Sequence, residues 1–157
     1  MLKTIGLILV FAIVAFQDWK ERQISVWVLV LWGLILGVSF VMEPVTFGIG
    51  LIQNLGLLVI QFALLYIYLM VRNRTIKVSF LKMIGLGDLL FLGLMAFSFN
   101  AQSFPFLLVG GLVFTLVSFL LISKMVKLSD PKVPLAGNMA IWLIITTVAN
   151  QMHWIEW

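Results

Sequence analysis

The sequence predicts an all-α membrane protein of six transmembrane helices with both termini outside, and two observations support this. Of its 157 residues, 63% are hydrophobic and only 10% are charged, whereas soluble domains are about 45–50% apolar. A water-soluble core of this size could not bury so much apolar surface, so lipid must be the solvent. Short polar segments also divide the chain into six apolar runs of about the length a bilayer requires. We therefore expect a single transmembrane domain over residues 1–157.

The first span is expected over Leu2–Gln17, an apolar run that ends at the polar segment 18–23. A lysine followed by an apolar run also opens secretory signal peptides, but these need small residues at a cleavage site. The segment Ala15-Phe16-Gln17 fits that pattern poorly. We therefore expect a retained helix.

The other five spans follow from the charges and turn formers that interrupt the apolar runs. The second stops at Glu43, because Pro44 disfavours helix in the residue before it. Within the fifth, Gly110-Gly111 should allow close packing against a neighbouring helix. The expected ranges are about Ile24–Met42, Phe47–Val71, Ile84–Phe99, Phe104–Ile122 and Leu135–Met152.

The basic residues indicate how these spans are oriented. With an external N-terminus, the loops on the inner side carry nine of the ten basic residues and leave only Lys3 outside. This is the bias that the positive-inside rule predicts for a multi-pass protein of the cytoplasmic membrane. No basic stripe with interleaved aromatics is present, so we expect no nucleic-acid partner. The nine inner residues are Lys20, Arg22, Arg72, Arg74, Lys77, Lys82, Lys124, Lys127 and Lys132.

Asp88 has apolar residues on both sides, at the start of the fourth expected span. An ionisable group in a membrane segment costs free energy and marks a functional candidate. Gly85 and Gly87 precede it closely, and glycines permit unusual dihedrals and close approach. The alternative is that Asp88 caps the helix, a common role for aspartate.

Asp18 ends the first expected span, and the topology places it on the same inner face as Asp88. Two carboxylates from separate helices at similar depth could share one water molecule, as in an aspartic protease. One would take a proton from water, while the other would donate to the scissile carbonyl, and the pair would titrate in two steps. The alternative for Asp18 is a solvated helix-end charge that pairs with Lys20 or Arg22.

Three segments in this order resemble the type IV prepilin peptidases and archaeal preflagellin peptidases, the GxGD class of intramembrane aspartyl proteases. Asp18–Ser25 is similar to the family's first-aspartate segment, an Asp followed by Arg-x-Ile-Pro. Gly85–Asp88 fits the GxGD signature. Lys132–Ala140 looks like the family's Ile-Pro-Phe-Gly-Pro segment, which opens the last helix. The resemblance covers essentially the whole chain.

The resemblance implies an endopeptidase that uses Asp18 and Asp88 as its catalytic pair and needs no metal or cofactor. It implies that Gly85 and Gly87 shape the turn that presents Asp88. Pro134 and Gly137 would bend the chain near the site and help to seat the substrate. The family's substrates are membrane-inserted prepilin-like or preflagellin-like precursors, cut at the cytoplasmic face between a short basic leader and a hydrophobic helix.

The chain departs from the family pattern in four ways. Ser25 stands where proline is usual, Leu90 replaces a frequent lysine, and Asn138 stands where a second proline is common. The chain also has no cysteine, whereas larger members carry a cysteine tetrad in a cytoplasmic domain that methylates the new amino terminus. We therefore expect the minimal peptidase without methyltransferase activity.

Two functions of other classes remain open. A small proton-coupled transporter could use Asp88 as a proton carrier, but it would need more acidic groups at mid-depth. A catalytically inactive scaffold of a pilus or secretion assembly is consistent with the departures from the family pattern. Asp130, before Pro131, is expected to form a turn, and His153 beside Trp154 is expected to anchor a helix end without binding metal.

Overall fold

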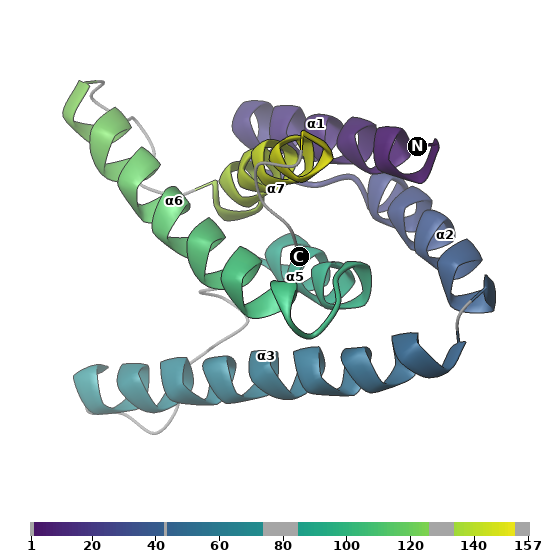
Figure 1. The fold of residues 1–157 in the computed structure, drawn as a ribbon. Coiled ribbons are helices and arrows are strands. Elements are labelled where there is room, and N and C mark those ends of the chain that lie inside the picture. The colour runs from purple at the N-terminus through teal and green to yellow at the C-terminus, as the bar shows by residue number, and fades with distance from the viewer. Residues whose placement is uncertain (1, 43, 74–84, 126–133, 153–157) are drawn as a thin grey trace.

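The chain is described by a computed structural model that places residues 2–42, 44–73, 85–125 and 134–152. These residues form helices and no strand, as expected (Figure 1). The helices are α1 (Leu2–Glu21), α2 (Val26–Met42), α3 (Pro44–Asn73), α5 (Leu86–Ser98), α6 (Ser103–Met125) and α7 (Leu135–Gln151).

Each expected span corresponds to one of these helices, but two boundaries are wrong in an informative way. Helix α1 does not stop at Gln17; it continues through Asp18 to Glu21. It ends where Arg22 adopts a φ of 55°, a left-handed conformation typical of the residue after a helix and rare outside glycine. Helix α3 begins at Pro44, because proline fits the first helical position, where its missing N–H needs no partner.

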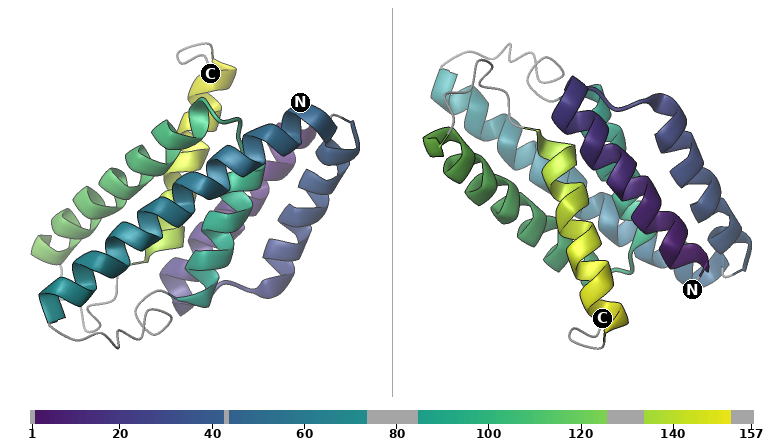
Figure 2. Two further views of the ribbon diagram at one scale, coloured as in Figure 1. Left: turned by 90° about the horizontal axis from the view of Figure 1, so that it is seen from below. Right: turned by 90° about the horizontal axis from the view of Figure 1, so that it is seen from above.

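Helix α7 lies between α1 and α6, and α5 lies centrally against α2, α3 and α7. Figure 2 shows that α1 and α7 run in opposite directions, as do α6 and α7. The C-terminal end of α1 therefore meets the N-terminal ends of α5 and α7 at one end of the bundle (Figure 2). This end carries Asp18 and Asp88.

Two helices of the described chain are long and apolar enough to cross a membrane. They cover Gly48–Val71 and Ser103–Ile122, of which only 11% and 22% are buried inside the protein. Their apolar side chains therefore face outward, as expected of helices in contact with lipid. Shorter apolar helices cover Val26–Val38 and Leu86–Ser98.

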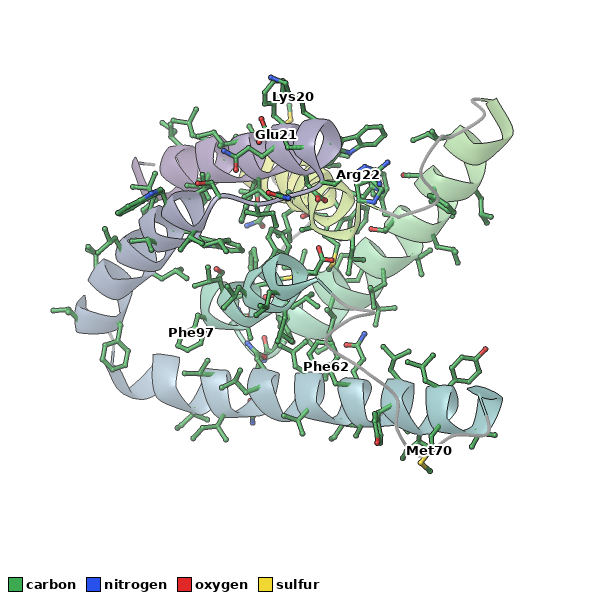
Figure 3. All side chains as sticks on the ribbon, turned by 180° about the vertical axis from the view of Figure 1, so that it is seen from behind. Lys20, Glu21, Arg22, Phe62, Met70 and Phe97 are labelled. Carbon is green, nitrogen blue, oxygen red and sulfur yellow. The ribbon has the colours of Figure 1, made fainter. Side chains whose placement is uncertain are left out.

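Helix α3 is attached to α5 by a buried asparagine. The Nδ2 atom of Asn54 donates hydrogen bonds to the carbonyl oxygens of Ala96 at 2.9 Å and Phe99 at 2.8 Å. The last carbonyls of a helix have no partner within that helix, so Asn54 satisfies two groups at the end of α5. Phe62, on the side of α3 that faces α5, packs against the core (Figure 3).

The predicted close packing at Gly110-Gly111 is confirmed. A Cβ atom at Gly110 would lie 2.7 Å from Cζ2 of Trp142, and one at Gly111 would lie 3.0 Å from Cε of Met139. Larger residues would therefore force α6 away from α7. The two glycines let these helices approach closely.

An aromatic cluster joins the two helices that carry the aspartates. Trp32 of α2 is fully buried; its ring centroid lies 5.0 Å from that of Phe11 in α1 and 5.2 Å from that of Phe91 in α5. Edge-on and tilted arrangements of this kind are favourable for aromatic rings. Trp32 therefore fixes the position of α1 relative to α5.

We expect Trp32→Ala to destabilise the protein by about 3–5 kcal/mol, because it leaves a large cavity between three helices. Denaturant or thermal unfolding of the purified protein in micelles measures this loss. Trp27→Ala is the matched control, since Trp27 lies in the same helix and is 81% exposed. Equal stability losses in the two variants would contradict the role given to Trp32.

Candidate active site

The Asp18 carboxyl group lies in the last turn of α1 and is buried, with only 6% of the residue exposed. Its Oδ2 atom accepts a hydrogen bond of 2.6 Å from the backbone N–H of Gly137, in the first turn of α7. Asp18 is thus not a fully solvated helix-end charge. It contacts a segment that lies 119 residues away in the sequence.

Asp88 lies in the first turn of α5, whose N-cap residue is Gly85. Its Oδ1 atom accepts a hydrogen bond of 3.2 Å from the backbone N–H of Ala136. The Asp88 carboxyl group therefore binds the backbone of α7, and Asp88 does not occupy the cap position of its own helix. An acidic group in this turn is also favoured by the α5 dipole.

The two carboxyl groups thus bind consecutive amides at the N-terminus of α7. The first N–H groups of a helix lack partners within it and carry partial positive charge, so they bind anions. Because consecutive backbone nitrogens are about 3–4 Å apart, the two accepting oxygens lie within roughly 9 Å of each other. Asp18 acts on Asp88 electrostatically across this distance. Each carboxyl group keeps a second oxygen outside this pair of hydrogen bonds.

Gly137 is required for this geometry. A Cβ atom on it would lie 2.9 Å from Cδ1 of Trp19 and 3.0 Å from Oδ2 of Asp18, closer than side-chain atoms normally approach. A side chain here would push α7 off α1. Helix α7 begins after Pro134, whose carbonyl oxygen accepts the first intrahelical bond, from the N–H of Asn138 at 3.1 Å.

The other two candidate glycines differ in importance. A Cβ atom at Gly85 would lie 3.3 Å from Oδ2 of Asp88, whereas one at Gly87 would make ordinary contacts of 3.5 Å or more with Ile24. Gly85 therefore leaves room for the Asp88 carboxyl group. Gly87 brings the start of α5 against the connection between α1 and α2.

The nearby charges lie mostly outside the site. Lys20 points away from α5 and α7 (Figure 3), and its Nζ atom lies 5.6 Å from the centre of the Phe16 ring. Arg22, which ends α1, is close enough to act electrostatically on Asp18.

Comparisons with family models, curated proteins and solved structures found no match to this chain. The resemblance to the GxGD proteases therefore depends on the three sequence segments alone.

Sequence reasoning missed two groups at this end of the bundle. The amide of Ala136 binds Asp88, and nothing in an alanine side chain could have indicated it. Ser25, noted only as a departure from proline, donates its backbone N–H to Oε1 of Gln17 at 3.0 Å. Proline lacks that N–H, so Ser25 allows a bond that closes the connection from α1 to α2.

Several predictions lie outside the described residues. These are the turn at Asp130 and Pro131, the helix-end role of His153 and Trp154, and most of the basic loop residues. Among the described residues, no group of three or more His, Asp or Glu side chains could hold a metal ion.

Proposed function

We propose that the protein is an intramembrane aspartyl endopeptidase with Asp18 and Asp88 as its catalytic pair. One observation carries the proposal: two carboxyl groups from separate helices bind consecutive amides of a third helix at one end of the bundle. Such pairs hold one proton between them, because both cannot ionise cheaply at close range.

The reaction follows from this arrangement. The ionised carboxylate takes a proton from a water molecule, whose oxygen attacks the scissile carbonyl carbon. The protonated carboxyl group donates its proton to the carbonyl oxygen, and a tetrahedral intermediate forms. Its collapse breaks the C–N bond, and the amine leaves with the proton taken from water. A hydroxyl proton of the intermediate returns to the carboxylate that had donated one, which restores the pair. The amides of Ala136 and Gly137 orient the two carboxyl groups throughout.

The proposed substrates are prepilin-like or preflagellin-like precursors, each with a basic leader and a hydrophobic helix. We place the protein in the cytoplasmic membrane with six spans and both termini outside, because this topology puts the basic loops inside. The Asp18 and Asp88 end of the bundle would then face the cytosol. A precursor inserted in the same bilayer would present its leader junction at that depth.

The direct test uses purified protein in bilayer discs with a synthetic precursor that has a basic leader and an apolar helix. Mass spectrometry should detect one cut at the leader junction. A precursor without the basic leader is the control and should remain intact. Absence of any cleavage across precursor sequences would refute the proposal.

We expect the pH dependence of kcat/KM to be bell-shaped, because only the form with one proton on the pair is active. Activity should fall at low pH, where both carboxyl groups are protonated, and at high pH, where both are ionised. Initial rates across pH with a precursor that lacks titrating groups near the cut measure this. A profile with one limb only would show that a single group titrates.

A further inference from the structure

Helix α7 carries a buried side-chain amide one residue after Gly137. Asn138 is 1% exposed, and in the described chain neither its Nδ2 nor its Oδ1 atom has a hydrogen-bond partner. Its backbone is paired with Pro134, so only the side chain is unsatisfied. Buried polar groups almost always have partners, and an exception requires an explanation.

Two further groups of the described chain are buried without a hydrogen-bond partner, one on α7 and one on α6. Trp142, with an unpaired Nε1, is four residues along α7 and so shares a face with Asn138. Thr115 of α6 is 3% exposed, and its Oγ1 is also unpaired. We call Thr115, Asn138 and Trp142 the polar strip.

Packing places the polar strip along one interface. Gly111 of α6 lies against Trp142, and α6 and α7 run in opposite directions (Figure 2). Thr115 lies four residues after Gly111 in α6, and Asn138 lies four residues before Trp142 in α7. Because the two helices are antiparallel, both residues lie toward the same end of the bundle. That end carries Asp18 and Asp88. On α7, Asn138 lies between Gly137, which is next to Asp18 of α1, and Met139, which is next to Gly111 of α6.

Two other hydroxyl groups of the described chain behave differently. The buried Thr146 donates to the carbonyl oxygen of Trp142 at 2.9 Å, and the half-buried Ser98 donates to that of Leu94 at 2.8 Å. Bonding to the carbonyl four residues back is the usual solution inside a helix. Thr115 does not form this hydrogen bond to its own helix, so the hydroxyl group of the polar strip needs a partner from elsewhere.

The chemistry of the polar strip indicates its ligand. The amide of Asn138 both donates and accepts, the hydroxyl of Thr115 does the same, and the indole of Trp142 donates. None of the three is charged, so an ion would gain little here. Buried groups of this kind typically hold ordered water, which makes two to four hydrogen bonds.

We propose that the polar strip binds water and delivers it to the Asp18 and Asp88 pair. This inference rests on the proposed proteolysis, since each peptide hydrolysed consumes one water molecule. The apolar outer surfaces of α3 and α6 would not carry water through lipid. Asn138 directly follows Gly137, whose amide binds Asp18, so water held by Asn138 lies at the same end of the bundle as the reacting groups.

Asn138→Leu tests this, because it keeps the number and branching of the side-chain heavy atoms and removes the amide. We expect kcat to fall about five- to tenfold, the effect of losing one net hydrogen bond, with KM unchanged. Thermal stability should change little, because the bound water is lost together with the amide that it pairs. Thr115→Val should lower kcat in the same way. Thr146→Val is the matched control, a buried threonine of α7 outside the polar strip, and should leave kcat unchanged.

Two outcomes would overturn the inference. A raised KM with unchanged kcat would show that Asn138 binds the precursor peptide. A loss of stability in Asn138→Leu without any change in kcat would show that the amide pairs with another protein group.

A second measurement does not depend on proteolysis. In protein labelled with ¹⁵N at asparagine and held in bilayer discs, the side-chain amide of Asn138 should show magnetisation transfer from water. Its absence would overturn water binding. Transfer in a protein that cuts no precursor would refute the proposed function and the delivery role, while leaving the water site itself established.

Discussion

Asp18→Asn and Asp88→Asn should each lower kcat/KM for precursor cleavage by at least about 10³-fold, because each removes an acid or base that the reaction requires. Asparagine keeps nearly the same shape, and its carbonyl oxygen can still accept the hydrogen bond from Gly137 or Ala136. Stability should therefore change little. Single-turnover cleavage by the purified variants measures the first effect, and thermal unfolding measures the second.

The same variants separate catalysis from a purely structural role, in which the two carboxyl groups only cap α7. Asparagine caps helices about as well as aspartate does, whereas alanine does not. Asp18→Ala should therefore lose about 1 kcal/mol of stability as well as activity. Full cleavage by Asp18→Asn and Asp88→Asn, together with destabilised alanine variants, would establish the capping role and end the protease proposal.

Gly137→Ala should reduce kcat/KM by about 10²-fold, the scale expected when reacting groups are misplaced by about 1 Å. The added Cβ would lie 3.0 Å from the carboxyl oxygen of Asp18 and 2.9 Å from a ring carbon of Trp19. Asp18 or α7 must then move, and the hydrogen bond between them lengthens. Cleavage rates at saturating precursor report this loss.

Gly93→Ala is the matched control, since a Cβ atom at Gly93 would have no atom within 4 Å. Alanine favours helix over glycine by about 1 kcal/mol, so this variant should be active and slightly more stable. If Gly137→Ala cleaved as fast as Gly93→Ala, the hydrogen bond from Gly137 to Asp18 would have no part in the reaction.

The helices were predictable because their signal is local. Runs of apolar residues bounded by charges and prolines indicated each helix of the described chain, and Gly110-Gly111 indicated where two of them meet closely. The two wrong boundaries, the end of α1 after Gln17 and the start of α3 before Phe47, have local causes too. A polar segment can continue a helix when its backbone bonds are made, as Arg22 shows by donating its N–H to the carbonyl oxygen of Asp18.

The sequence by itself determined the helices of the described residues and their highly apolar composition, and it marked Asp18 and Asp88 as candidate site residues. Only the tertiary structure decided that both bind the start of α7, and that the side chain of Asn138 is buried there with no partner among the described residues. The physical reason is that every helix offers free amides at its N-terminus, whatever its side chains. Which carboxyl groups reach those amides depends on how α1, α5 and α7 pack, and packing is set by contacts between residues far apart in the chain.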